Sequence, residues 1–330
     1  MRPIPQSVLD YCKQPALLVT NLTNIRYLTG LDLSDGSLLV LPKSFILFAD
    51  SRYREMAEQK ADGLVTVQSD TALKPMIEQL PICGFEQSHV TYGRYLRWKK
   101  TFKTTKFTPT SDAIEHFRRS KDEVELRHIR RAEKITVELL RRIPAALKKG
   151  ITEIDLAWKI EQWARELGAE GMAFDSIVGF GTHTSRPHHH PTTRKLLKGM
   201  MVQIDIGVKV RGYCSDRSAV YFTAPMTAQQ KKIYDAVSDA KDTAKKAAKK
   251  GSSVRELDRI AREVLAEYGL EKYFTHSLGH GVGLDIHEGV SLSARAPDDR
   301  LLSGEVITIE PGVYIPGKFG MRLEDMVIVQ

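Results

Sequence analysis

The sequence predicts an α+β protein of two domains, a mixed α/β domain over residues 1–120 and a pseudo-symmetric domain over residues 121–330. Three observations support this prediction. The first third of the chain alternates short apolar strands with helices. From Lys121 the pattern changes to long amphipathic helices. Beyond that point, a module of two helices and two strands occurs twice.

The N-terminal domain is indicated by short apolar segments that alternate with helical ones. Residues 38–41 (Leu-Leu-Val-Leu) and 45–48 (Phe-Ile-Leu-Phe) have the composition of buried strands. Residues 53–60 have a helical pattern, and residues 65–67 form a further short strand. A length of 330 residues is comfortable for two such domains.

A long helix is expected to begin after Asp122. Its apolar residues recur at helical spacing, and they are Ile129, Ala132, Ile135, Leu139, Leu140 and Ile143. Pro144 should kink or stop this helix, because proline has no N–H to donate. The change of pattern places the domain boundary near residue 120.

The second domain contains an internal duplication. One helix pair is divided by a Lys-Lys-Gly sequence at residues 148–150 and closes at Gly168. A later pair is divided by the same sequence at residues 249–251 and closes at Gly269. The second helix of the later pair starts at a capping box, Ser253–Glu256. Each pair is followed by a histidine-bearing segment and a two-strand unit, so we expect one module used twice.

Each half offers two carboxylates on a predicted hairpin. Asp205 lies in an alternating apolar strand, and Asp216 lies where the chain returns; Glu310 and Glu324 have the same places in the second half. A carboxylate in an apolar strand is costly to bury unpaired. Four converging carboxylates would repel one another unless cations lay between them. Two divalent cations would neutralise all four.

A histidine framed by glycines, His280 in residues 279–283, could complete the ligand set. One histidine with four carboxylates is a hard, oxygen-rich set. It favours Mn²⁺ or Co²⁺, with Fe²⁺ or Zn²⁺ as alternatives, over a structural thiolate zinc site.

Two further histidines, His188 and His287, fit catalytic rather than ligand roles. His188 opens a run of three histidines, and such a run can also be an opportunistic surface metal site. We expect at most one of the three to face the chemistry, which leaves His189 and His190 without a role.

Composition excludes several classes of partner. The net charge is +8, from 49 Lys and Arg against 41 Asp and Glu, but the basic residues are spread out and lack interleaved aromatics, so no nucleic-acid partner is expected. Three cysteines without a C-x-x-C pair suit a reducing compartment. No signal-like segment opens the chain, and no window approaches about 18 consecutive apolar residues. We therefore expect no membrane partner and a cytoplasmic location.

These residues resemble a metallopeptidase superfamily that includes methionine aminopeptidase, aminopeptidase P and prolidase. The motifs that support the resemblance are Ile204–Gly207, Tyr213–Asp216, His276–Gly283 with His287-Glu288, Thr308–Gly312 and Arg322–Asp325. Residues Asn24–Gly30 and Ala49–Tyr53 resemble the creatinase-type N-terminal domain of the proline-specific members. The resemblance implies a pseudo-symmetric pita-bread catalytic domain at 121–330.

The resemblance also implies how the ligands are shared. Asp205 and Asp216 would hold one metal, with Asp216 bridging. His280 and Glu310 would hold the other, and Glu324 would bridge. A water or hydroxide between the ions would be the nucleophile.

Roles for the remaining candidates follow from the same resemblance. Glu310 would also move the proton, and His188 and His287 would hydrogen-bond the scissile carbonyl or the tetrahedral intermediate. Arg322 would steady Glu324. The family often has Asp-x-Thr-Arg where this chain has residues 216–219 as Asp-Arg-Ser-Ala, so Ser218 would replace the threonine.

The implied activity is cleavage of Xaa-Pro bonds, with peptides carrying proline at the second position as substrates. Aminopeptidase P-like action on longer peptides is preferred to Xaa-Pro dipeptidase (prolidase) action, because no local basic motif clearly serves a substrate carboxylate. A non-catalytic binding module and metal-free creatine-type hydrolysis are further alternatives, but both discard ligands that are intact here. Relatives are commonly dimers, so a homodimer is expected.

Overall fold

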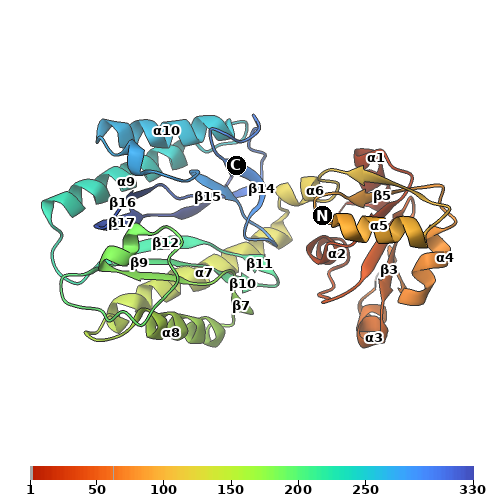
Figure 1. Ribbon diagram of the computed structural model, residues 1–330, viewed down its shortest axis with the longest axis horizontal. Helices are drawn as coiled ribbons and strands as arrows, with labels where there is room; N and C mark the ends of the chain where they lie inside the picture. The colour runs from red at the N-terminus through yellow and green to blue at the C-terminus, as the bar shows by residue number, and fades with distance from the viewer. Residues whose placement is uncertain (1–2, 62) are drawn as a thin grey trace. The chain divides into compact units, whose positions relative to one another are not determined.

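The computed structural model describes residues 3–61 and 63–330, and the chain divides into two compact units, Met1–Arg118 and Arg119–Gln330 (Figure 1). The predicted boundary near residue 120 lies beside this division. None of the helices in the described part of the chain has both the length and the apolar composition to cross a membrane.

Unit 1 is built on a six-stranded mixed sheet in the order β4-β3-β2-β1-β5-β6. Its strands are β1 (Leu17–Val19), β2 (Ser37–Leu41), β3 (Ser44–Ala49), β4 (Val65–Ser69), β5 (Ile82–Glu86) and β6 (Lys106–Thr110). Its helices are α1 (Pro5–Cys12), α2 (Leu22–Thr29), α3 (Ser51–Lys60), η1 (Asp70–Ala72), α4 (Leu73–Ile77), α5 (Tyr92–Thr101) and α6 (Glu115–Arg119), the last of which reaches the division. β2 pairs antiparallel with β1 and β3, whereas the outer pairs are parallel.

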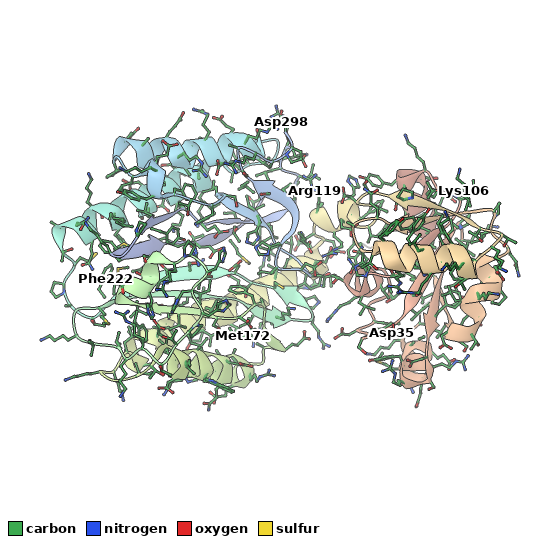
Figure 2. All side chains as sticks on the ribbon, viewed as in Figure 1. Asp35, Lys106, Arg119, Met172, Phe222 and Asp298 are labelled. Carbon is green, nitrogen blue, oxygen red and sulfur yellow. The ribbon has the colours of Figure 1, made fainter. Side chains whose placement is uncertain are left out.

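Both faces of the sheet of unit 1 are covered by apolar cores. Alternate side chains of a strand point to opposite faces, so a single strand can contribute to both cores. In β3, Phe45 and Leu47 join one apolar core, and Ile46 and Phe48 join the other. Figure 2 shows the side chains that fill the space between this sheet and its helices. The apolar segments at residues 38–41 and 45–48 were therefore predicted correctly as strands.

Unit 2 has two helix pairs with strands between them (Figure 1). The pairs are α7 (Glu123–Ala146) with α8 (Glu153–Glu166), and α9 (Ala228–Ala247) with α10 (Val254–Glu267). Thr152 caps α8 in a capping box with Asp155. The capping box predicted at Ser253–Glu256 is only half formed: Ser253 accepts from the Glu256 N–H, but the Glu256 carboxylate bonds to Arg259.

Of the two outcomes expected at Pro144, a kink or a stop, α7 does not stop there but continues for two residues to Ala146. Proline cannot donate to the carbonyl four residues earlier, which is that of Leu140. The Tyr221 hydroxyl donates to this carbonyl over 2.7 Å instead. A partner from another element therefore satisfies the acceptor that proline leaves open.

The strands of unit 2 form small sheets in the orders β12-β9-β8, β11-β10-β7, β14-β13-β15-β18 and β16-β17. In the first half they are β7 (Gly171–Met172), β8 (Ile177–Phe180), β9 (Met201–Ile206), β10 (Val208–Val210), β11 (Tyr213–Cys214) and β12 (Arg217–Phe222), with η2 (Gly181–Ser185). In the second half they are β13 (Gly279–Gly281), β14 (Glu288–Leu292), β15 (Val306–Ile309), β16 (Gly312–Ile315), β17 (Phe319–Arg322) and β18 (Asp325–Ile328), with η3 (Glu271–Tyr273).

The duplication appears as two nested hairpins. β9 pairs antiparallel with β12 around the inner pair β10–β11, and β15 pairs antiparallel with β18 around β16–β17. Asp205 lies on β9 and Asp216 directly precedes β12; Glu310 directly follows β15 and Glu324 directly precedes β18. Each outer hairpin therefore presents two carboxylates near the start of its inner hairpin.

Candidate metal centre and active site

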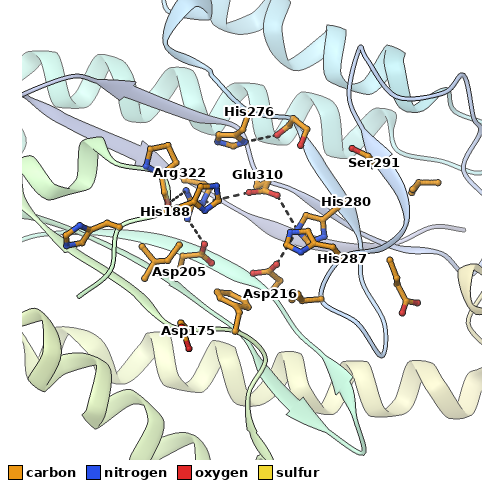
Figure 3. Close-up of a pocket in the computed structure, with 18 of the residues that line it drawn as sticks. Asp175, His188, Asp205, Asp216, His276, His280, His287, Ser291, Glu310 and Arg322 are labelled. Atoms are coloured by element: carbon orange, nitrogen blue, oxygen red, sulfur yellow. Dashed lines mark hydrogen bonds and ion pairs between the residues drawn. The ribbon is translucent and has the colours of Figure 1, made fainter. Parts of the chain in front are cut away.

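A cavity of about 690 Å³ opens in unit 2 and is lined by residues from both halves (Figure 3). Its wall includes Asp205, Asp216, His280 and Glu310, four of the predicted metal ligands. The fifth, Glu324, is 3% exposed and lies behind this wall. One carboxylate oxygen from each of Asp205, Asp216 and Glu324 lies within 4.8 Å of the other two. The two hairpins therefore bring the predicted ligands together.

His280 joins the carboxylates through Nε2, which lies 3.5 Å from both Asp216 Oδ2 and Glu310 Oε1. Its Nδ1 donates to the Gly281 carbonyl over 3.1 Å, so Nε2 keeps its lone pair toward the carboxylates. Burial, and next the neighbouring His287, lower the pKa of His280 to about 4. A neutral imidazole with this tautomer is suited to bind a metal.

The glycines around His280 are needed for close packing. A Cβ on Gly279 would lie 2.1 Å from the Thr308 carbonyl oxygen, and one on Gly281 would lie 2.1 Å from that of Glu288. Both contacts are with backbone atoms, which cannot easily move aside. The glycine frame therefore lets β13 approach its neighbouring strands.

The carboxylates are electrostatically unfavourable as an isolated group. Burial, followed by repulsion from Glu324 and Asp205, raises the pKa of Asp216. Burial likewise raises the pKa of Glu324 and brings that of Glu310 to about 8. Two buried oxygens, Asp205 Oδ1 and Glu324 Oε1, have no hydrogen-bond partner among the described residues. Unpartnered buried oxygens in a cluster of negative charge fit divalent cations.

Arg322, which also lines the cavity, and Ser218 lie beside the carboxylates. Arg322 Nη2 pairs with Asp205 Oδ2 at 2.5 Å. Arg322 Nε donates to the Ser218 hydroxyl over 2.9 Å, and this hydroxyl donates to Glu324 Oε2 over 2.9 Å. The expected support of Glu324 by Arg322 thus runs through Ser218, while the direct ion pairs of Arg322 are with Asp205 and, at 3.9 Å, with Glu310.

A polar chain beside Arg322 was missed by sequence reasoning. Arg322 Nη1 donates to the Tyr314 hydroxyl oxygen over 2.6 Å. His276 Nδ1 donates to the Ser277 carbonyl, so its Nε2 accepts from Tyr314 over 3.0 Å. Burial lowers the pKa of His276 to about 4 and raises that of Tyr314 to about 12. The chain therefore joins a neutral histidine of the cavity wall to the arginine that pairs with Asp205.

The remaining predicted histidines also line the cavity. The ring of His287 lies 4.0 Å from that of His280, and burial followed by the charge of His188 lowers the pKa of His287. His188 lies in the cavity together with Asp205 and Glu310 (Figure 3). His190 is exposed, whereas His189 is buried and hydrogen-bonded to Glu153. His189 therefore has a specific partner that the sequence did not reveal.

Two family models match the chain. That of metallopeptidase family M24 matches residues 127–330, and that of the creatinase/prolidase N-terminal domain matches residues 13–120. An Xaa-Pro dipeptidase of Pyrococcus horikoshii is 34% identical over 317 residues, which cover 95% of this chain and 90% of the relative. The sequence similarity therefore extends over both units.

Solved structures share the whole architecture. An Xaa-Pro dipeptidase from Bacillus anthracis superposes with a TM-score of 0.93 at 31% identity, covering 99% of this chain and 93% of that one. An X-Pro aminopeptidase from Thermotoga maritima superposes with a TM-score of 0.89, also at 31% identity, covering 98% and 95%. These likenesses confirm the predicted α+β fold with its pita-bread domain.

Proposed function

The chain belongs to metallopeptidase family M24, and from this premise we propose that it is a two-metal peptidase that hydrolyses peptide bonds preceding proline. The observation that supports the metal chemistry best is the convergence of three buried carboxylates, the half-buried Glu310 and the lone pair of His280. The substrate class is supported by the names of the relatives and by the match of residues 13–120 to a creatinase/prolidase domain.

In this proposal Asp205, Asp216, His280, Glu310 and Glu324 would together hold the two cations. The oxygen-rich set favours Mn²⁺ or Co²⁺, with Zn²⁺ or Fe²⁺ as alternatives. Bound divalent cations would supply Lewis-acid catalysis and lower the pKa of a water molecule.

The side chains around the centre would bind the substrate and move the proton. Glu310 would accept a proton from the attacking water and later deliver it to the leaving amine. The Thr308 hydroxyl donates to Glu310 Oε1 over 3.3 Å and helps to orient it. His188 and His287 would donate hydrogen bonds to the scissile carbonyl as negative charge develops on its oxygen.

Two modes of action remain, and the cavity wall supports the aminopeptidase mode. A dipeptidase must bind the free carboxylate of its substrate's proline, which calls for a cation. Arg322 is the single arginine or lysine among the described residues of the wall, and it is already bonded to Asp205, Ser218 and Tyr314. The second candidate, dipeptidase action, is supported by the relatives that are named Xaa-Pro dipeptidases.

Hydrolysis of Ala-Pro, Ala-Pro-Ala and a longer Xaa-Pro peptide by Mn²⁺-loaded protein tests both parts of the proposal. We expect the longer peptides to be cleaved after the first residue and Ala-Ala-Ala to be a poor substrate. Cleavage of Ala-Pro alone would establish the dipeptidase mode. Failure on all proline peptides, with both metals bound, would refute the substrate class.

A cytoplasmic location is supported by the three free thiols of Cys12, Cys83 and Cys214, the latter two buried. Peptides are the proposed partners. The homodimer and the exclusion of nucleic acid stay predictions.

A further inference from the structure

A second buried polar group lies at the cavity wall, and we name it the Glu153 cluster: Glu153, His183, His189 and Thr192. Glu153 is the first residue of α8 and is fully buried. Its Oε1 accepts from the Phe180 N–H and from His183 Nδ1, both over 2.8 Å. Its Oε2 accepts from His189 Nε2, the Thr192 N–H and the Thr192 hydroxyl, over 2.9, 2.9 and 2.6 Å.

By residue type, Glu153, His183 and His189 could hold a metal ion. Their hydrogen bonds favour another interpretation. Five donors fill the lone-pair sites of one carboxylate, which has room for about four. Burial acts to raise the pKa of Glu153, but the hydrogen bonds from His189, Thr192, Phe180 and His183 lower it overall. The carboxylate is therefore already satisfied as an anion.

The Glu153 cluster anchors the segment that carries His188. On one side of His188, the Pro187 carbonyl accepts from Arg322 Nη1 over 3.3 Å. On the other side, the ring of His189 is buried against Glu153. Further along, the Thr192 carbonyl accepts from the Ile154 N–H over 3.1 Å, at the start of α8. His188 is thus held between two fixed neighbours, although its own side chain is exposed to the cavity.

We propose that Glu153 and His189 are positioning residues, which hold the backbone of residues 187–192 so that His188 reaches the substrate carbonyl. The inference rests on the proposed function, because it gives His188 a hydrogen-bonding role in hydrolysis. Catalytic donors are sensitive to placement: a shift of about 1 Å can cost about 10²-fold in rate. A side chain on an exposed segment needs such an anchor.

The test is a double-mutant cycle between His189 and His188 in the Mn²⁺-loaded protein. His189→Ala should lower kcat by about 10-fold, with both metals retained. His189→Gln should recover most of this loss, because its amide N–H can still donate to Glu153. In the His188→Ala background, His189→Ala should have no further effect, since the two residues act through one group. Glu161→Gln, on the exposed surface of the same helix, is the matched control and should leave kcat unchanged.

If His189→Ala lowers kcat by the same factor with and without His188, the proposal is overturned and the role of His189 is purely structural. Full activity of His189→Ala would also overturn it. A parent protein that cleaves no Xaa-Pro peptide would instead refute the proposed function. Backbone hydrogen exchange of residues 187–192 then tests whether His189 anchors this segment, independently of any activity. Faster exchange in His189→Ala, restored by His189→Gln, would support it, and unchanged exchange would refute it.

Discussion

The Ser218 hydroxyl donates a hydrogen bond to Glu324 Oε2 over 2.9 Å, and it joins the two halves of unit 2 at the metal centre. Ser218 lies on β12 of the first hairpin, and Glu324 precedes β18 of the second. The same hydroxyl accepts from Arg322 Nε, so one side chain orders both a proposed ligand and the arginine that pairs with Asp205.

Ser218→Ala should therefore weaken activity modestly, and Ser218→Thr should preserve it. Alanine leaves two buried polar groups without this partner, which costs about 1–3 kcal/mol in the free energy of unfolding. The measurements are kcat, metal affinity and denaturant unfolding of both variants. If both variants match the parent, the hydroxyl has no role in the centre.

Removing metal should abolish peptide hydrolysis. The ligand cluster contains unpartnered buried carboxylate oxygens, and bound cations would lower the pKa of the attacking water before Glu310 takes its proton. Activity should return with Mn²⁺ or Co²⁺ and should track metal content measured by elemental analysis. Full activity in a preparation free of transition metals would contradict the two-metal mechanism.

Substitutions should separate ligands from substrate-binding residues. His280→Ala and Glu310→Gln should lose metal affinity together with activity. His287→Ala should lower turnover by about 10²-fold while both metals stay bound, which is the scale of one lost oxyanion donor. Loss of metal from His287→Ala would mean that the two adjacent histidines have been assigned the wrong way round.

The metal-free protein should lose stability as the pH rises. Burial raises the pKa of Glu310 from 4.5 to about 8, and those of Asp216 and Glu324 shift in the same direction. Between the unfolded and the folded pKa, the folded state keeps a proton that the unfolded state has released, so the free energy of unfolding falls as the pH rises. For Glu310, the stabilising contribution is complete below about pH 4.5 and is lost as the pH rises through about 8.

Thermal unfolding with and without EDTA across this pH range checks that prediction. The midpoint of the metal-free parent should fall more steeply with pH than that of Glu310→Gln. Mn²⁺ should flatten the parent's profile, because bound cations stabilise the ionised carboxylates. Identical slopes for parent and variant would show that the pKa of Glu310 is not raised in the folded, metal-free protein.

The Tyr221 hydroxyl should stabilise α7 through the carbonyl of Leu140. Tyr221→Phe should lower the free energy of unfolding by about 1–3 kcal/mol, because a carbonyl in the helix then lacks a donor. In the Pro144→Ala background the cost should shrink, since the substituted residue supplies the missing N–H. Denaturant unfolding of the four proteins measures the difference, and equal costs in both backgrounds would exclude this compensation.

Asp205 and His280 could be found from sequence because each breaks a local pattern, whereas Asp216, Glu310 and Glu324 were expected from the repeated hairpin and the family resemblance. Asp205 interrupts an alternating apolar strand, and His280 stands among glycines, so a single segment is enough to reveal the anomaly. The fold class followed from similar local evidence, namely the change from short strands to long amphipathic helices at Lys121.

The residues that were missed depend on distant partners. Tyr314 lies in a short apolar strand, β16, and is indistinguishable from a core residue until Arg322 and His276 are placed beside it. The sequence assigns no role to His189, because its partner Glu153 lies 36 residues earlier. The hydrogen bond to the Leu140 carbonyl, which Pro144 cannot make, likewise comes from Tyr221, 81 residues away. The spacing of residues along the chain does not predict contacts between such distant residues.

The nesting of the two hairpins also bears on the lifetime of the folded molecule. The proposed ligands are spread from residue 205 to residue 324, and neither hairpin presents more than two of the four carboxylates. Contacts this distant along the chain form late in folding. A cation that binds only the completed centre is absent from the transition state, so it slows unfolding and leaves the folding rate nearly unchanged. Metal loading would thus raise the kinetic stability of unit 2 by lowering its unfolding rate.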